Sequence, residues 1–117
     1  AGVDALSNVI CVELGPFGVR SNCIAPGFIA GTEGASRLVP KGSDDMVKAF
    51  IPAQRIGERT DIANAAVFLF SEAANWITGQ VIAVDGGQMH FRSAWLPYPQ
   101  SSLDPRSFKN LFPDLRL

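Results

Sequence analysis

The sequence predicts an α/β fold built on a parallel sheet. Strand-like and helix-like segments alternate along the chain, an order typical of sheets whose parallel strands are joined by helices. Residues 81–84, Val-Ile-Ala-Val, form a short continuous apolar run, which favours a strand covered on both faces. Only two strands can be recognised, and two strands alone do not make a parallel sheet. We therefore expect further strands and helices upstream.

The first element is predicted to be a helix that ends near Gly15-Pro16, because glycine commonly follows a helix and proline prevents its continuation. No start signal precedes this helix, and its pattern is already present at Ala1. We therefore expect the chain to be cut inside a helix, with the N-terminal half of the fold missing. The apolar stripe of this helix fits either a core or a subunit interface, and comprises Val3, Leu6, Ile10 and Leu14.

The middle of the chain reads as a strand followed by a long loop. The strand is expected at residues 19–25 and ends at Pro26-Gly27. Residues 28–42 are expected to form a loop with one helical turn at 34–38. Ser43 should cap a short helix over residues 43–51, which Pro52 stops.

A second long helix is predicted from an N-cap at Thr60 to Ser71, with Ile62, Ala66 and Leu69 on its apolar side. After a turn at residues 72–79 comes the strand at 81–84, closed by Asp85-Gly86-Gly87. The alternation of helix-like and strand-like segments ends after Gln88. We therefore expect one domain over residues 1–88 and an irregular tail over 89–117.

Composition excludes several kinds of function. Ten basic and eleven acidic residues give a net charge of −1 without a basic run, which argues against nucleic-acid binding. No apolar stretch approaches the roughly 20 residues that span a bilayer. Cys11 and Cys23 form no CxxC pair and are expected to be buried thiols. His90 is the only histidine, so no metal site is predicted.

Three motifs carry most of the functional information. Residues 20–27 read Arg-Ser-Asn-Cys-Ile-Ala-Pro-Gly, followed by Phe-Ile-Ala-Gly-Thr at 28–32; residues 78–87 read Thr-Gly-Gln-Val-Ile-Ala-Val-Asp-Gly-Gly. Between them lie Arg55-Ile56-Gly57 and Asp61-Ile62-Ala63. Each motif alone is a common turn. Together, and in this order, they resemble the C-terminal signatures of the short-chain dehydrogenase/reductase family, over residues 1 to about 88.

The resemblance implies the C-terminal part of a Rossmann-type doubly wound parallel sheet, with NADPH as cofactor. In such sheets the ligand lies beyond the carboxyl ends of the strands. The backbone at Ile29 would hold the nicotinamide carboxamide, and the Thr32 hydroxyl would bind the cofactor, cap the following helix, or do both. The cofactor-binding residues implied are Pro26, Gly27, Phe28, Ile29, Ala30, Gly31 and Thr32.

Within the family, Thr32-Glu33-Gly34, Ser36-Arg37-Leu38 and residues 74–79 resemble 2,4-dienoyl-CoA reductases of the peroxisomal type. That resemblance implies hydride transfer from NADPH to a conjugated acyl-CoA in fatty-acid β-oxidation. Arg37 would contact the acyl-CoA, since a guanidinium recognises phosphate well; a solvated surface arginine is the alternative. Reduction of an enoyl-CoA or 3-oxoacyl thioester, and a non-catalytic oligomerisation or binding module, are the other functions considered.

No catalytic residue is assigned to this chain. The family's catalytic lysine would fall just before Ala1, and Tyr98 lacks a lysine at the family's spacing. We therefore predict that the chain alone is inactive. The resemblance also implies a homo-oligomer and a peroxisomal location, with the cytoplasm as the alternative. The final Leu-Arg-Leu at residues 115–117 matches a peroxisomal signal at two of three positions.

Overall fold

The computed structural model of the chain describes residues 1–38, 40 and 42–91. The elements are α1 (Gly2–Leu14), β1 (Cys23–Pro26), α2 (Glu33–Leu38), α3 (Asp44–Ala49), α4 (Arg59–Phe70) and β2 (Val81–Val84). Short 3₁₀ turns lie at Gly15–Phe17, Glu72–Ala74 and Gln88–His90. No helix in this part of the chain has the length and apolar character needed to cross a bilayer.

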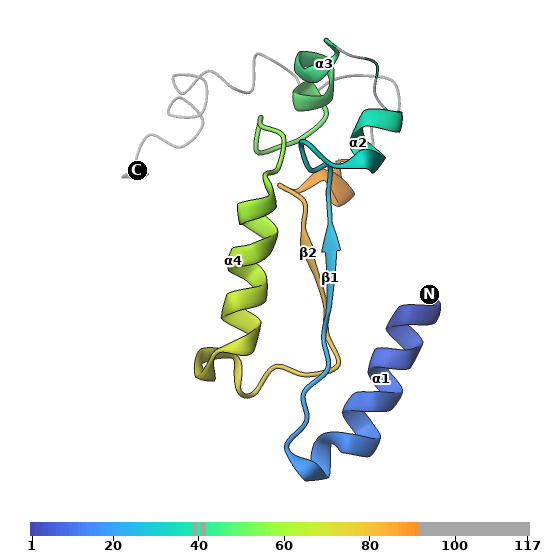
Figure 1. Ribbon diagram of the computed structural model, residues 1–117, viewed down its shortest axis with the longest axis vertical. Helices are drawn as coiled ribbons and strands as arrows, with labels where there is room; N and C mark the ends of the chain where they lie inside the picture. Colours follow the sequence, from blue (N-terminus) through green and yellow to red (C-terminus); the bar gives the residue numbers. More distant parts are fainter. Residues whose placement is uncertain (39, 41, 92–117) are drawn as a thin grey trace, which may run out of the picture.

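The two strands pair in parallel, as the sequence predicts. Their register runs from Cys23 opposite Val81 to Pro26 opposite Val84. Helix α4 runs along one side of the pair and α1 lies on the other, while α2 and α3 gather beyond the carboxyl ends of the strands (Figure 1). The observed architecture is therefore an α/β arrangement whose loops converge at one end of the sheet.

Strand β1 is shorter than residues 19–25, the range predicted for it. The residues before it use side chains to bind the end of α4 and the turn before β2. Arg20 donates to the carbonyl of Leu69 (2.6 Å), and Asn22 donates through Nδ2 to Ile77 (2.8 Å). The Asn22 Oδ1 also accepts the backbone N–H of Gln80 (3.0 Å). These side-chain contacts accompany a backbone hydrogen bond from Gly79 to Ser21 (2.6 Å), and regular strand pairing begins at Cys23.

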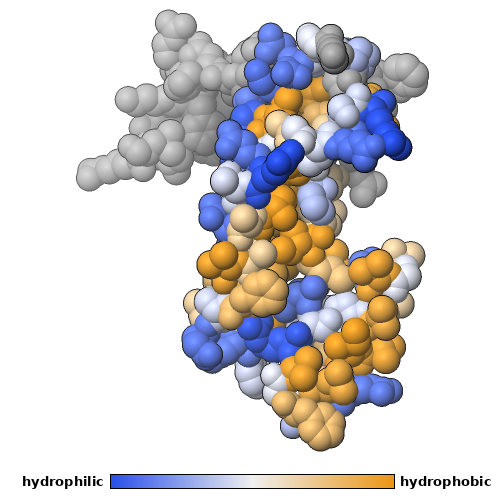
Figure 2. Space-filling view, viewed as in Figure 1, coloured by the Kyte–Doolittle hydropathy of each residue, from blue (hydrophilic) through white to orange (hydrophobic). Residues whose placement is uncertain are grey.

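Helix α1 packs through a serine. Ser7 is the buried residue of this helix, and its hydroxyl lies 2.8 Å from that of Ser21. By contrast Val3 and Leu6, on the apolar stripe, are 72% and 61% exposed. Figure 2 shows hydrophobic residues gathered on the surface over α1. The sequence left open whether this stripe packs in the core or in a subunit interface. Among the described residues, the stripe does not form part of the core.

The start of α4 differs from the prediction. Glu58, not Thr60, is the N-cap residue, and it forms a capping box with Asp61. In that box the backbone N–H of Glu58 donates to Asp61 Oδ2 (2.7 Å). Thr60 lies inside the helix and donates to the Glu58 carboxylate (3.3 Å). Ser43 does precede α3, but its side chain makes no capping hydrogen bond.

Strand β2 is also less covered than predicted. Val81 and Ala83 are exposed, whereas Ile82 and Val84 are partly buried. Helix α4 packs on the strand pair, but Val81 stays 52% exposed. The stripe of α4 does face inward, with Leu69 buried. Most of the predicted tail, with Tyr98 and residues 115–117, lies outside the described residues.

Candidate functional site

The predicted cofactor-binding residues begin with Pro26, the last residue of β1, and continue through the loop that follows it; we call residues 26–32 the 26–32 loop. The loop leaves the sheet beside the end of β2, where Gly27 donates its N–H to the carbonyl of Val84 (3.0 Å). A Cβ on Gly27 would lie 2.6 Å from the Cα of Asp85. Only a glycine can bring the loop this close to the second strand.

The centre of the 26–32 loop is bound to a second loop. Ile29 forms an isolated parallel bridge with Gly57, in which Gly57 donates to Phe28 O (3.0 Å) and Ala30 donates to Gly57 O (2.8 Å). In such a bridge the N–H and C=O of the central residue point away from the partner strand. The Ile29 carbonyl accepts the Thr32 hydroxyl (2.9 Å), but its N–H donates to no described residue. Within the described part of the chain, the N–H of Ile29, a residue that is itself buried, is therefore unpaired.

Two grooves flank the loop and together include all seven predicted residues. The first, of about 480 Å³, is mainly apolar and is bordered by Arg59. The second, of about 570 Å³, lies along the far half of the loop. The first groove is lined by Pro26, Gly27, Phe28, Ile29, Thr32, Gly34, Ala35, Leu38, Arg59 and Ile62.

Thr32 joins the loop to α2. Its Oγ1 accepts the backbone N–H of Ala35 (3.2 Å) while donating to the carbonyl of Ile29. The predicted capping role of Thr32 is therefore confirmed, and the same hydroxyl also restrains Ile29. Contact between Thr32 and a cofactor stays a prediction.

Arg37 lies apart from the loop residues. Its side chain is 76% exposed and pairs with Glu33, one turn earlier on α2. It lines neither of the two grooves around the 26–32 loop. The structure therefore places Arg37 near the site but turned toward solvent, where an acyl-CoA contact stays a prediction.

Several residues that hold the loop were not predicted from the sequence. Gln88 accepts the backbone N–H of Phe28 through Oε1 (3.2 Å), and Arg59 donates to the carbonyl of Gly31. Gly57 binds both sides of Ile29. Of these three residues, only Gly57 belongs to a motif recognised in the sequence, Arg55-Ile56-Gly57. No role was predicted for that motif.

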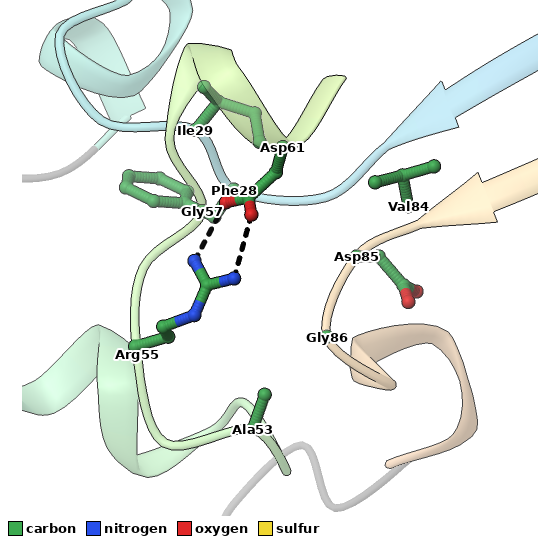
Figure 3. Close-up of a pocket in the computed structure, with 9 residues that line it drawn as sticks. All are labelled: Phe28, Ile29, Ala53, Arg55, Gly57, Asp61, Val84, Asp85 and Gly86. Carbon is green, nitrogen blue, oxygen red and sulfur yellow. Dashed lines mark hydrogen bonds and ion pairs between the residues drawn. The ribbon is translucent and has the colours of Figure 1, made fainter. Parts of the chain in front are cut away.

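The charged groups of the site are fixed by short hydrogen bonds. Arg55 donates to both carboxylate oxygens of Asp61, and Figure 3 shows the pair at the edge of a small cavity of about 90 Å³ beside Phe28 and Ile29. The hydrogen bond from Arg55 lowers the pKa of Asp61 to about 2. On the other side of the cavity, the backbone N–H of Met89 lowers the pKa of Asp85. Both carboxylates are therefore held in their charged form.

No metal-ligand cluster occurs in the described part of the chain: no three His, Cys, Asp or Glu side chains come together there. Both cysteines are free and partly buried.

The fold and this site define a class of protein. A parallel α/β sheet whose glycine-containing loop opens a groove beyond the strand ends is the arrangement of Rossmann-type nucleotide-dependent oxidoreductases. A family model described as enoyl-(acyl carrier protein) reductase matches residues 1–89. The chain belongs to the short-chain dehydrogenase/reductase family.

Two curated relatives share a function in their names. The chain is 53% identical over 90 residues to a peroxisomal 2,4-dienoyl-CoA reductase of Saccharomyces cerevisiae, covering 77% of this chain and 31% of the relative. It is 45% identical over 98 residues to the peroxisomal 2,4-dienoyl-CoA reductase of Danio rerio, covering 82% and 30%. The chain thus spans about a third of the length of these relatives.

Among solved structures, an NADPH-dependent reductase involved in bacilysin biosynthesis matches with a TM-score of 0.66 and 36% identity. The match covers 74% of this chain and 36% of that one. The predicted fold class is therefore confirmed over the region that the chain contains.

Proposed function

We propose that this chain is the C-terminal part of an NADPH-dependent 2,4-dienoyl-CoA reductase of fatty-acid β-oxidation, and that its 26–32 loop holds the nicotinamide end of the cofactor. The observation that carries the proposal is the free N–H of Ile29 in a loop whose neighbouring backbone groups are paired. An amide donor that is fixed in place and unpaired suits a carboxamide oxygen.

The residues of the loop fit this cofactor in two further ways. Gly27 leaves no side chain between the loop and the end of β2, and a Cβ there would collide with Asp85. Gly57 donates to the Phe28 carbonyl, which lies in the same peptide unit as the Ile29 N–H, so this unit cannot rotate without breaking that hydrogen bond. When bound, the nicotinamide supplies the hydride. The chain's own residues orient it, and the apolar groove limits water around it.

The substrate assignment rests on the relatives and on Arg37. Both curated relatives named above are 2,4-dienoyl-CoA reductases. The Arg37 guanidinium is exposed and its present partner Glu33 is equally exposed, so it can exchange this weak surface pair for a phosphate of coenzyme A. We assign Arg37 to the CoA portion of the substrate.

We propose that the 117-residue chain by itself has no reductase activity. The chain covers 31% of the yeast relative, and the groups that the resemblance implies for catalysis and for binding the cofactor phosphates have no counterpart in it. NADPH, rather than NADH, is likewise proposed from the resemblance.

One observation favours each of two other functions. The description of the matching family model, enoyl-(acyl carrier protein) reductase, favours another thioester as substrate. The exposed apolar surface of α1 favours an oligomerisation module. We propose a homo-oligomer for the reductase as well, assembled through this surface, and a peroxisomal location, which both relatives carry in their names.

The direct test follows NADPH absorbance with a 2,4-dienoyl-CoA, using the complete product of the gene that encodes this chain beside the 117-residue chain. Turnover by the complete product alone supports the proposal. Turnover of a 3-oxoacyl or enoyl thioester in its place would keep the family and reject the substrate. Activity of the short chain would reject the claim that the chain alone is inactive. Replacing NADPH by NADH tests the cofactor preference.

A further inference from the structure

The position of Ile29 depends on Gly57. Gly57 bonds to the residue before Ile29 and to the residue after it, at 3.0 and 2.8 Å. The contact is close, because a Cβ on Gly57 would lie 2.6 Å from Ile29 Cδ1 and 3.2 Å from Phe28 O. A shift of Gly57 must therefore move the backbone of Ile29.

Gly57 is held in turn by charged side chains on either side of it in sequence. Arg55 donates from both terminal nitrogens to the two oxygens of Asp61, each at 2.7 Å (Figure 3). The Asp61 Oδ2 also accepts the N–H of Glu58 (2.7 Å). Asp61 belongs to the first turn of α4, so these three bonds tie the segment around Gly57 to a helix packed on the sheet.

The exposure of the pair limits its contribution to stability. The side chain of Arg55 is 59% exposed and that of Asp61 is 28% exposed, and solvent-exposed ion pairs contribute little to folding. Its two-point geometry, however, fixes both the distance and the direction of the guanidinium. The pKa of Asp61 is lowered to about 2, mainly by the hydrogen bond from Arg55, so the pair stays charged at neutral pH.

We propose that Arg55 and Asp61 are positioning residues that set, through Gly57, the place of the Ile29 backbone at the nicotinamide end of the cofactor. The inference rests on the proposed function of the 26–32 loop. Both residues act through the backbone of Gly57 and need no contact with cofactor or substrate. Their effect should therefore be confined to the nicotinamide end.

The experiment compares Asp61→Asn with a matched control, Lys48→Gln, in the complete gene product. Lys48 forms an exposed ion pair with Asp45 at 3.0 Å on α3 and lines neither groove around the 26–32 loop. The readouts are kcat, the Kd for NADPH, and the Kd for adenosine 2′,5′-bisphosphate, which lacks the nicotinamide. For Asp61→Asn we expect kcat to fall by roughly 10- to 100-fold, the scale of a small misplacement of reacting groups. The Kd of the bisphosphate should stay at the wild-type value, as should all values for Lys48→Gln.

A second variant, Arg55→Lys, keeps the charge and removes the two-point geometry. It should reproduce much of the loss in kcat, with an unchanged pH profile; wild-type kcat in this variant would overturn the proposal. Equal weakening of NADPH and of the bisphosphate would indicate a general structural role and overturn it too. A wild-type protein that binds no NADPH would reject the proposed function itself. Unchanged kcat in Asp61→Asn, with an active wild type, rejects only the positioning role.

Discussion

Gly27 lies directly against Asp85, so closely that a Cβ on the glycine would fall 2.6 Å from the Cα of the aspartate. The two residues follow the paired ends of β1 and β2, where Pro26 is opposite Val84. Gly27 does not have a positive φ, so this position is glycine because of the neighbouring backbone and not because of its own conformation. The contact joins two motifs that are far apart in the sequence into one site.

Substitution Gly27→Ala is therefore expected to destabilise the protein by roughly 1–3 kcal/mol, the usual range for an overpacked site. It should also weaken NADPH binding, because the loop must move away from β2. Urea unfolding and cofactor titration of the complete gene product measure both. For stability, the control is Gly34→Ala on α2, where a Cβ meets open space and alanine should add up to about 1 kcal/mol. Equal stability of the two variants would contradict this account.

Removing the Arg37 side chain should affect the substrate and not the cofactor. For Arg37→Ala we expect the KM for a 2,4-dienoyl-CoA to rise roughly tenfold, the scale of one lost hydrogen bond between charged groups. The KM for NADPH should not change. Glu33→Gln frees Arg37 from its present ion pair, so it should leave the substrate KM unchanged or lower it. An unaltered substrate KM in Arg37→Ala would show that Arg37 is only a solvated surface residue.

The exposed side of α1 makes a prediction about assembly. Substitution Leu6→Lys puts a charge on a residue that is 61% exposed in the chain alone and that we propose to be buried between subunits. Light scattering after size-exclusion chromatography should show a smaller species than the wild type. Met46→Lys, at a position 56% exposed on α3, serves as control and should leave the mass unchanged. A Leu6→Lys protein of wild-type mass would contradict the proposed interface.

Acid should weaken the fold partly through Asp61. Its pKa is about 2, below the ordinary value of 3.8, chiefly because Arg55 donates to it. A carboxyl group with a lowered pKa stabilises the folded state above its unfolded pKa, and this stability is lost as pH falls through the folded pKa. The free energy of unfolding should therefore decrease from about pH 4 to pH 2, and less steeply in Asp61→Asn. Parallel curves for the two proteins would contradict the prediction. Asp85, whose pKa is also lowered, should keep some of the slope in both.

Local patterns predicted the elements that depend on local chemistry. Helix α1 ends before Gly15-Pro16, and Leu69 on the apolar side of α4 is buried, as expected. Gly86 and Gly87 both have positive φ, which suits the turn predicted after β2. Each of these features follows from propensity, spacing or backbone freedom within a few residues.

Features that depend on distant partners were missed. Gln88 and Phe28 are bonded across 60 residues, and no local pattern indicates such a contact. Residue preference predicted Thr60 as the N-cap of α4. In the structure Arg55 binds Asp61, and Asp61 occupies the third position of the helix, so Glu58 is the N-cap residue. The predicted orientation of α1 stayed open because exposed and buried apolar stripes look alike in sequence.

The most direct test of the account is a crystal structure of the complete gene product with NADPH. The central claim is that the free N–H of Ile29 binds the nicotinamide carboxamide. It predicts a carboxamide oxygen at about 2.7–3.2 Å from the Ile29 nitrogen, with Gly27 still against Asp85. A nicotinamide held by other residues, with no partner for the Ile29 N–H, would contradict it.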